Sequence, residues 1–165
     1  MQVRVGTAAD VEAVRAIAHA TWPSTFGDIL APDQIEYMLA WMYDAERLTE
    51  QLTTGGQGLL LAELPGADAA HGFAMYEPHY RPATTKLHKL YVLPKGHRRG
   101  TGRALATAVA KAARAAGDAT LRLDVNYLNP ATRFYERLGF RKVDEVTTEI
   151  GRGYLMEDYV YELSL

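Results

Sequence analysis

Cysteine is absent from the 165-residue chain, and serine occurs only at Ser24 and Ser164. The chain therefore has no disulfide, no thiolate metal ligand and no cysteine nucleophile. Neither serine lies in a G-x-S-x-G sequence, so the nucleophile pattern of an α/β-hydrolase is missing. No apolar run reaches 18 residues, which excludes an ordinary membrane-spanning helix. We expect a cytoplasmic protein without a membrane partner.

Motifs for metal and triphosphate binding are missing as well. The G-x-x-x-x-G-K-[ST] loop does not occur. The formal net charge of −2 argues against nucleic-acid binding, because such proteins usually carry a broad basic surface. The histidines follow no metal-ligand spacing; they are His19, His71, His79, His88 and His97. We expect neither a metal nor a nucleic-acid partner.

Hydrophobic periodicity predicts one α/β domain covering residues 1–165, with a mixed, mostly antiparallel sheet and flanking helices. Because a helix separates two of the strands, we expect these two to be parallel neighbours at the centre of the sheet. The expected elements are a strand at 2–5, helices beginning at Thr7, near Pro32 and before Leu48, strands at 58–63, 72–77 and 87–93, a helix from Gly102 to Gly117, a strand at 121–125, a short helix at 130–138, and two antiparallel strands at 140–146 and 154–163.

Prolines mark two segments that we expect to be irregular. Pro23 should break the first helix, so residues 19–26 are predicted to be less regular than the residues before them. Residues 78–85 are rich in proline, histidine and tyrosine. This segment is predicted to be a loop that leads into the central strand.

The stretch LHKLYVLPKGHRRGTGR, residues 87–103, runs from an apolar strand through a basic turn into a helix. A helix N-terminus carries unpaired N–H groups and partial positive charge, so this turn is suited to a phosphate or pyrophosphate. Glycines here could also simply permit a tight turn. The candidate anion-binding residues are His97, Arg98, Arg99, Gly100, Thr101, Gly102 and Arg103.

A second stretch, DVNYLNPATRFYERLGF at residues 124–140, also passes from a strand end into a helix. If the two strands are parallel neighbours, their carboxyl ends meet at one edge of the sheet, where open α/β sheets bind ligands. Tyr135 would then lie near whatever the basic turn holds. In the alternative interpretation, Phe134 and Tyr135 are core aromatics, and Asn126 and Asn129 only shape a turn and cap the helix.

Together, LYVLPKGHRRGTGRAL and NPATRFYERLGF resemble the GNAT superfamily of N-acetyltransferases. The turn departs from the family pattern, because His97 stands in the slot that glutamine or arginine fills and Arg98 stands where glycine is frequent. The segments TWPSTFG and EIGRGYLMEDYVYEL are similar to the bacterial PaiA-like spermine/spermidine acetyltransferase group.

The resemblance implies that acetyl-CoA is the cofactor and that an amine attacks its thioester directly, without an acyl-enzyme. A backbone N–H near Tyr91 or Val92 would polarise the carbonyl, and Tyr135 would protonate the departing thiolate. Besides the basic turn, the residues implied at the CoA site are Leu90, Tyr91, Val92, Asn126, Asn129, Ala131, Phe134 and Tyr135.

The base and the acceptor are less determined by the sequence. Glu77 and His88 are the preferred candidates for the base, and His79 is a further one. Aromatic and acidic residues could bind a small primary amine, such as a polyamine, by cation–π and charge attraction; they are Trp22, Phe26, Glu36, Tyr37 and Tyr80. A protein or peptide amine, and a non-catalytic acyl-CoA-binding module, are the alternatives. The sequence leaves open whether the protein forms a homodimer.

Overall fold

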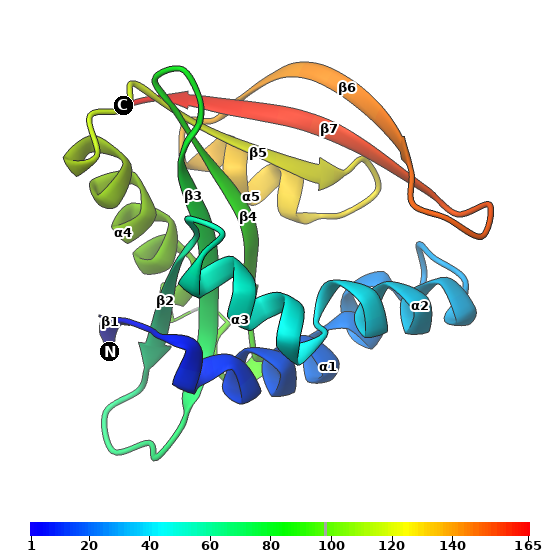
Figure 1. Ribbon diagram of the computed structural model, residues 1–165, viewed down its shortest axis with the longest axis horizontal. Coiled ribbons are helices and arrows are strands. Elements are labelled where there is room, and N and C mark those ends of the chain that lie inside the picture. Colours follow the sequence, from blue (N-terminus) through cyan, green and yellow to red (C-terminus); the bar gives the residue numbers. More distant parts are fainter. Residues whose placement is uncertain (98) are drawn as a thin grey trace.

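The computed structural model describes residues 1–97 and 99–165. These residues form a seven-stranded sheet in the order β1-β2-β3-β4-β5-β7-β6 (Figure 1). Only β4 and β5 pair in parallel, and the other neighbours are antiparallel. The expected mixed sheet with one central parallel pair is confirmed. The strands are β1 (Gln2–Val5), β2 (Gly58–Glu63), β3 (Ala70–Arg81), β4 (Thr84–Val92), β5 (Thr120–Asn126), β6 (Arg141–Glu149) and β7 (Leu155–Ser164).

Helices cover both faces of the sheet (Figure 1). On one face, α1 (Val11–Phe26), α2 (Pro32–Met42) and α3 (Ala45–Thr53) enclose an apolar core. On the other, α4 (Thr101–Ala115) and α5 (Ala131–Arg137) enclose a second one. Short 3-10 turns, η1 (Ala8–Asp10) and η2 (Pro94–Gly96), precede α1 and follow β4. Within the described ranges, no helix combines the length and apolar character that a membrane crossing needs.

The first helix starts as predicted but does not break at its proline. Thr7 and Asp10 form a capping box, with the Thr7 side chain accepting from Ala9 and Asp10 accepting from Thr7. Helix α1 then continues through Pro23 to Phe26, so the expected irregularity of residues 19–26 is wrong. His19 and Pro23 are both exposed. The carbonyl that loses its partner at Pro23 therefore lies on the solvent side, which makes the proline tolerable.

The predicted loop at residues 78–85 is also wrong, because β3 extends to Arg81 and β4 begins at Thr84. Pro78 falls where the register between Glu77 and Arg81 is interrupted, so its missing N–H costs no ladder hydrogen bond. Asp118 fixes this end of the hairpin from the loop before β5. Its carboxylate accepts from the His79 backbone N–H at 2.9 Å and from Thr85 Oγ1 at 2.6 Å. Burial alone would raise the pKa of Asp118, but these hydrogen bonds hold it below its usual value.

The central parallel pair is short, and this creates the opening in the sheet. Residues 84–87 of β4 pair with residues 120–123 of β5, and the parallel register ends at Leu87 and Leu123. Directly after this point β4 contains a bulge: Tyr76 pairs with Leu87 and Met75 with Lys89, which leaves His88 as the extra residue. A bulge bends its strand. Beyond it, β4 and β5 are no longer paired within the described chain.

Candidate functional site

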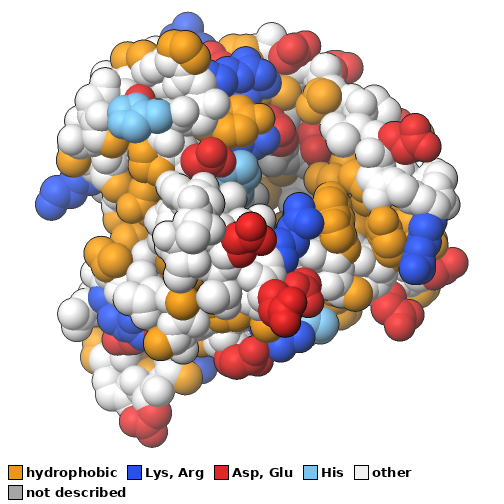
Figure 2. Space-filling model, viewed as in Figure 1, with side chains coloured by type: hydrophobic (Ala, Val, Ile, Leu, Met, Phe, Trp, Pro, Cys, Tyr) orange, Lys and Arg blue, Asp and Glu red, His pale blue; other side chains and the backbone are white. Residues whose placement is uncertain are grey.

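The divergence of β4 and β5 opens a cavity of about 230 Å³ between the α1–α2 layer and the strands β5 and β7. Figure 2 shows a hollow on this side of the molecule, with hydrophobic, basic and acidic side chains at its rim. The wall residues used below are Trp22, Phe26, Lys86, His88, Lys89, Leu90, Tyr91, Asp124, Asn126, Asn129, Ala131, Tyr135 and Asp158. Helix α2 reaches across to the far strands, since Gln34 Nε2 donates to the Leu155 carbonyl at 3.0 Å.

The basic turn leads into α4 without a side-chain cap among the described residues. Gly100 has φ +77°, and a Cβ there would meet no atom within 4 Å, so the space over the helix N-terminus is open. Thr101 is buried, and its hydroxyl pairs with His71 Nε2 at 3.1 Å. Burial lowers the pKa of His71. These contacts fix the first turn of α4 and leave its N–H groups directed at the open space.

Gly102 connects the two sequence motifs. A Cβ at this position would lie 3.1 Å from Phe134 Cζ of α5, so a larger residue would push the two helices apart. Phe134 is thus a packing partner of α4 and is not part of the cavity wall described above. The predicted proximity of the turn and α5 is present in the structure.

The basic side chains of the turn differ in whether the described protein residues hold them in place. The His97 ring donates from Nε2 to the carbonyl of Val92, the last residue of β4, at 2.8 Å, and this hydrogen bond holds the turn against the end of that strand. The side chains of Arg99 and Arg103 are exposed. Arg98, also predicted to contact the cofactor, lies outside the described residues.

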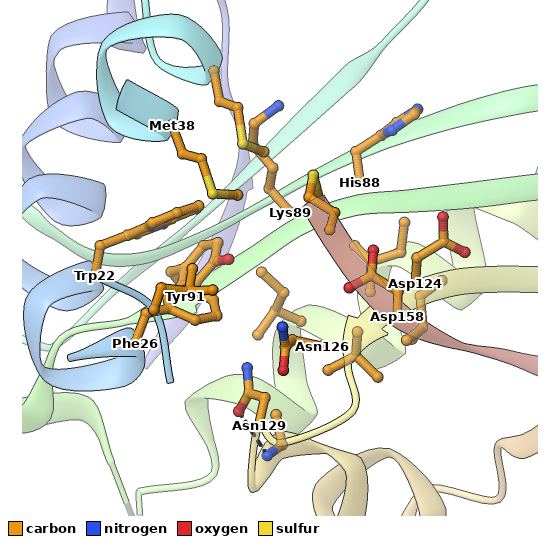
Figure 3. Close-up of a pocket in the computed structure, with 18 of the residues that line it drawn as sticks. Trp22, Phe26, Met38, His88, Lys89, Tyr91, Asp124, Asn126, Asn129 and Asp158 are labelled. Carbon is orange, nitrogen blue, oxygen red and sulfur yellow. Dashed lines mark hydrogen bonds between the residues drawn. The ribbon is translucent and has the colours of Figure 1, made fainter. Parts of the chain in front are cut away.

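Tyr135 lies at the cavity wall, where it is 7% exposed, and Phe134 and Phe140 contact its ring edge-to-face. Burial raises the pKa of its phenol well above the usual value, so the hydroxyl stays protonated at neutral pH. Asn126 and Asn129 also reach the cavity (Figure 3). Their amide oxygens accept from the backbone of Leu128 and Ala131, each at 2.9 Å, so both asparagines do shape the turn before α5.

Two candidates for the base are in direct contact. His88 Nε2 lies 2.7 Å from Glu77 Oε2, and His88 lines the cavity while Glu77 stands behind it. Burial lowers the pKa of His88 although the Glu77 carboxylate opposes this shift, which leaves the ring neutral and able to accept a proton at neutral pH. His79 is directed elsewhere, toward Asp118.

The structure divides the acceptor candidates. Trp22 and Phe26 line the cavity, with ring centroids 4.6 Å apart. Glu36 faces a separate surface depression beside His19, and the Tyr37 hydroxyl donates to the Ile150 carbonyl at 2.7 Å. Tyr80 is exposed beside His88 and already carries the Lys86 ammonium over its ring. Glu36, Tyr37 and Tyr80 are therefore not brought to the cavity wall, because helix phase and the hairpin twist direct them away.

Four charged wall residues, Lys86, Lys89, Asp124 and Asp158, were missed as site candidates in the sequence. Lys89 is 7% exposed, and burial together with the charge of Arg47 lowers its pKa to about 8. Asp124 and Asp158 come from adjacent strands, β5 and β7. The strand alternation around Asp158 was a usable signal, since a charged residue at an inward position of a strand is unusual. The bulge at His88 hid it for Lys89.

The comparisons with known proteins agree with this geometry. The model of the acetyltransferase (GNAT) domain matches residues 28–158. No curated protein sequence matches the chain. Among solved structures, the PaiA N-acetyltransferase of Thermoplasma acidophilum in complex with coenzyme A is 20% identical, with a TM-score of 0.83 and full coverage of both chains.

Two further structures are similar. A GCN5-related N-acetyltransferase of Rhodopseudomonas palustris is 25% identical with a TM-score of 0.82, covering 99% of this chain and 95% of its own. YncA of Salmonella typhimurium, a putative acetyltransferase solved with its cofactor acetyl-CoA, is 23% identical with a TM-score of 0.66, covering 99% and 93%. The domain match spans most of the sequence and includes the turn, the diverging strands and α5, and the chain belongs to the GNAT family of acetyltransferases.

Proposed function

We propose that this acetyltransferase transfers the acetyl group of acetyl-CoA to a primary amine by direct attack, and that the acceptor is a small cation such as a polyamine. The observation that carries the proposal is the cavity at the divergence of β4 and β5. It has a protonated phenol on one side, Tyr135, and the hydrogen-bonded pair of His88 and Glu77 on another.

The residues of the turn fit the cofactor. The uncapped N-terminus of α4 offers backbone N–H groups and a partial positive charge to a pyrophosphate. Gly100 leaves room for the anion to approach, and Arg99 and Arg103 add cationic side chains. From there the acyl arm would run past Leu90 and Tyr91 on β4, with Asn126, Asn129 and Ala131 opposite.

Three groups of this chain would act on the reaction. The edge of β4 beyond Leu87 is free of ladder pairing with β5, so a backbone N–H near Tyr91 can hydrogen-bond the thioester oxygen as negative charge develops there. His88, oriented by Glu77, accepts a proton from the ammonium so that the nitrogen lone pair becomes available. Tyr135 gives its proton to the departing sulfur and regains one from the new amide nitrogen.

The preference for a polyamine has two supports besides the resemblance of the sequence. Trp22 and Phe26 present aromatic surface to the cavity, which favours alkylammonium groups. The structural similarity to a PaiA N-acetyltransferase covers the whole chain. A peptide amine or an aminoglycoside amine would use the same chemistry and is the alternative acceptor.

Release of free CoA tests the proposal. Acetyl-CoA is incubated with the protein and with spermidine, putrescine, amino acids, aminoglycosides or short lysine peptides, and the rate without acceptor is subtracted. We expect turnover of amines, with the lowest KM for the polyamines. Efficient turnover of a peptide or aminoglycoside without polyamine turnover would refute the proposed polyamine acceptor. If no amine raised CoA release above the rate without acceptor, amine acetylation itself would be refuted.

A further inference from the structure

Asp158 is a buried carboxylate at the cavity wall that the proposed chemistry does not use. The residue lies on β7 and is 9% exposed, and its carboxylate makes no hydrogen bond or ion pair with any residue in the ranges 1–97 and 99–165. Asp124 of β5 lies beside it (Figure 3). Asp124 Oδ2 accepts from Lys86 Nζ at 2.9 Å, while its buried Oδ1 has no partner among those residues. This end of the cavity therefore holds two carboxylates and one lysine.

The negative charges of Asp124 and Asp158 are not both balanced by the one lysine beside them. Burial, and next the repulsion from Asp124, raise the pKa of Asp158 to about 6, so it is ionised at neutral pH at a cost in free energy. Lys86 already donates to Asp124 and does not neutralise both carboxylates. A ligand cation placed at Asp158 would supply the missing charge and hydrogen-bond donors.

The other charged groups of the cavity restrict the position at which a ligand ammonium is favoured to the end that holds Asp124 and Asp158. Lys89 also lines the cavity from β4; its ammonium lies 5.6 Å from the centroid of the Tyr43 ring, and Arg47 is a second cation nearby. Both repel an ammonium there. The titratable groups that act on Asp158 from the elements packed around it are Asp124 of β5 and Lys86 and Tyr91 of β4.

The sheet order separates Asp158 from the proposed base. Strand β5 lies between β4 and β7, and paired strands are about 4.8 Å apart, so the β7 backbone is roughly 10 Å from that of β4 where the ladder is intact and farther away where β4 and β5 diverge beyond Leu87 and Leu123. An aliphatic chain of several methylene groups can span from His88 on β4 to Asp158 on β7. A molecule with one ammonium at each end would engage both.

We propose that Asp158, with Asp124 beside it, binds the ammonium of a diamine or polyamine acceptor that is not acetylated, and thereby selects diamines over monoamines. The inference rests on the proposed acetylation of amines and assigns the acceptor class to a particular residue. Asp158 acts here as a specificity-determining residue and takes no part in the transfer itself.

The test compares putrescine with n-butylamine, which has the same carbon chain and lacks one ammonium. We expect wild type to prefer putrescine in kcat/KM by roughly tenfold or more, the effect of one charge-assisted hydrogen bond. Asp158→Asn should abolish this preference through the KM of putrescine and leave n-butylamine within about twofold, the range of an unperturbed site. Asp158→Glu should keep part of the preference. Glu157→Gln removes the neighbouring exposed carboxylate on β7 and should keep all of it.

Calorimetric titration of putrescine into the CoA-loaded protein separates this proposal from the proposed reaction. Weaker binding to Asp158→Asn than to wild type supports the anchor even if no amine is acetylated. The proposal would be overturned if Asp158→Asn lowered kcat/KM equally for putrescine and n-butylamine. It would also be overturned if Glu157→Gln lowered kcat/KM for putrescine as much as Asp158→Asn does. Unchanged putrescine binding in a folded Asp158→Asn variant would overturn it as well.

Discussion

The two ends of the proposed site, the turn before α4 and the acidic part of the cavity, are built in different ways. At the cofactor end, the turn before α4 offers backbone N–H groups and a small residue, Gly100, and its support comes from contacts made by Thr101 and Gly102. At the acceptor end, the buried Asp158 and the half-buried Asp124 lie on separate strands, and among the described residues the Asp158 carboxylate has no partner. Backbone recognition is encoded locally, whereas the charged end requires the sheet to be assembled.

This difference has an energetic side. An uncapped helix N-terminus at the surface is solvated when no anion is bound, so it costs the folded protein little. A buried carboxylate without a partner keeps its cost until a ligand arrives. The cofactor end should therefore respond to substitutions mainly in binding, and the acceptor end in both binding and stability.

The largest effect is expected between the two ends, at Tyr135. Replacing Tyr135 by Phe removes the hydroxyl proton that we propose is given to the leaving sulfur, and loss of a general acid lowers kcat by roughly 100- to 10,000-fold. The affinity for acetyl-CoA should stay nearly unchanged, because the ring and its contacts with Phe134 and Phe140 remain. Steady-state kinetics and calorimetry measure the two quantities.

Tyr159→Phe is the matched control, since Tyr159 is a half-buried tyrosine of β7 outside the cavity wall. It should keep full turnover. Full turnover in Tyr135→Phe, with the chemical step shown to limit the rate, would remove Tyr135 from the acid role.

The next effect concerns the stability of the acceptor end and its pH dependence. The pKa of Asp158 is raised to about 6 in the folded protein from an ordinary value of 3.8. The folded protein therefore binds this proton more tightly than the unfolded chain does. Relative to an uncharged side chain, the free energy of unfolding is unaffected well below pH 4, where the carboxyl is protonated in both the folded and the unfolded state, and it falls as the pH rises through 6. Asp158→Asn should match wild type near pH 4 and be more stable above pH 7, by up to about 3 kcal/mol.

Chemical denaturation at several pH values measures this difference. Glu157→Gln should show no comparable change with pH, because Glu157 is exposed. A free-energy difference between Asp158→Asn and wild type that stays constant from pH 4 to pH 8 would contradict the raised pKa.

The smallest of these effects is expected at the cofactor end. The double substitution Arg99→Glu and Arg103→Glu reverses two exposed charges beside the N-terminus of α4 and should weaken acetyl-CoA binding by roughly 10- to 100-fold at low salt. The effect should shrink as salt is added. Lys111→Glu with Arg114→Glu reverses the same number of charges farther along α4 and should leave the affinity within about twofold. Equal affinities of the two double variants would place the pyrophosphate elsewhere.

Much of the fold could be predicted from local signals. The start at Thr7, the helices near Pro32 and Leu48, and the turn before α4 follow from capping residues and apolar spacing that neighbouring residues determine. The errors occurred where tertiary structure overrides a local rule. Pro23 is tolerated because its side of α1 faces solvent, and residues 78–85 extend the strands because Asp118, distant in sequence, fixes the hairpin.

The site shows the same division. That α5 lies near the turn was predicted from the expected parallel pairing of the two strands that precede them, and the structure brings the two segments together at Gly102 and Phe134. The positions of Glu36 and Tyr37 could not be predicted from composition, since their direction depends on how α2 is rotated against the sheet. Asp124 and Asp158 are 34 residues apart and become neighbours only through the pairing of β5 with β7.

The short parallel pair has a mechanical consequence. Residues 84–87 and 120–123 form the whole ladder between the β1–β4 and β5–β7 portions of the sheet, whereas β6 and β7 share eight residue pairs. The line between β4 and β5 is therefore a seam with few backbone hydrogen bonds. It is reinforced at one end by the carboxylate of Asp118, which accepts from His79 and Thr85. Strain applied to the sheet would concentrate between β4 and β5. A rotation of the two portions of the sheet about the Asp118 end would change the angle between them, and the width of the cavity would change with that angle.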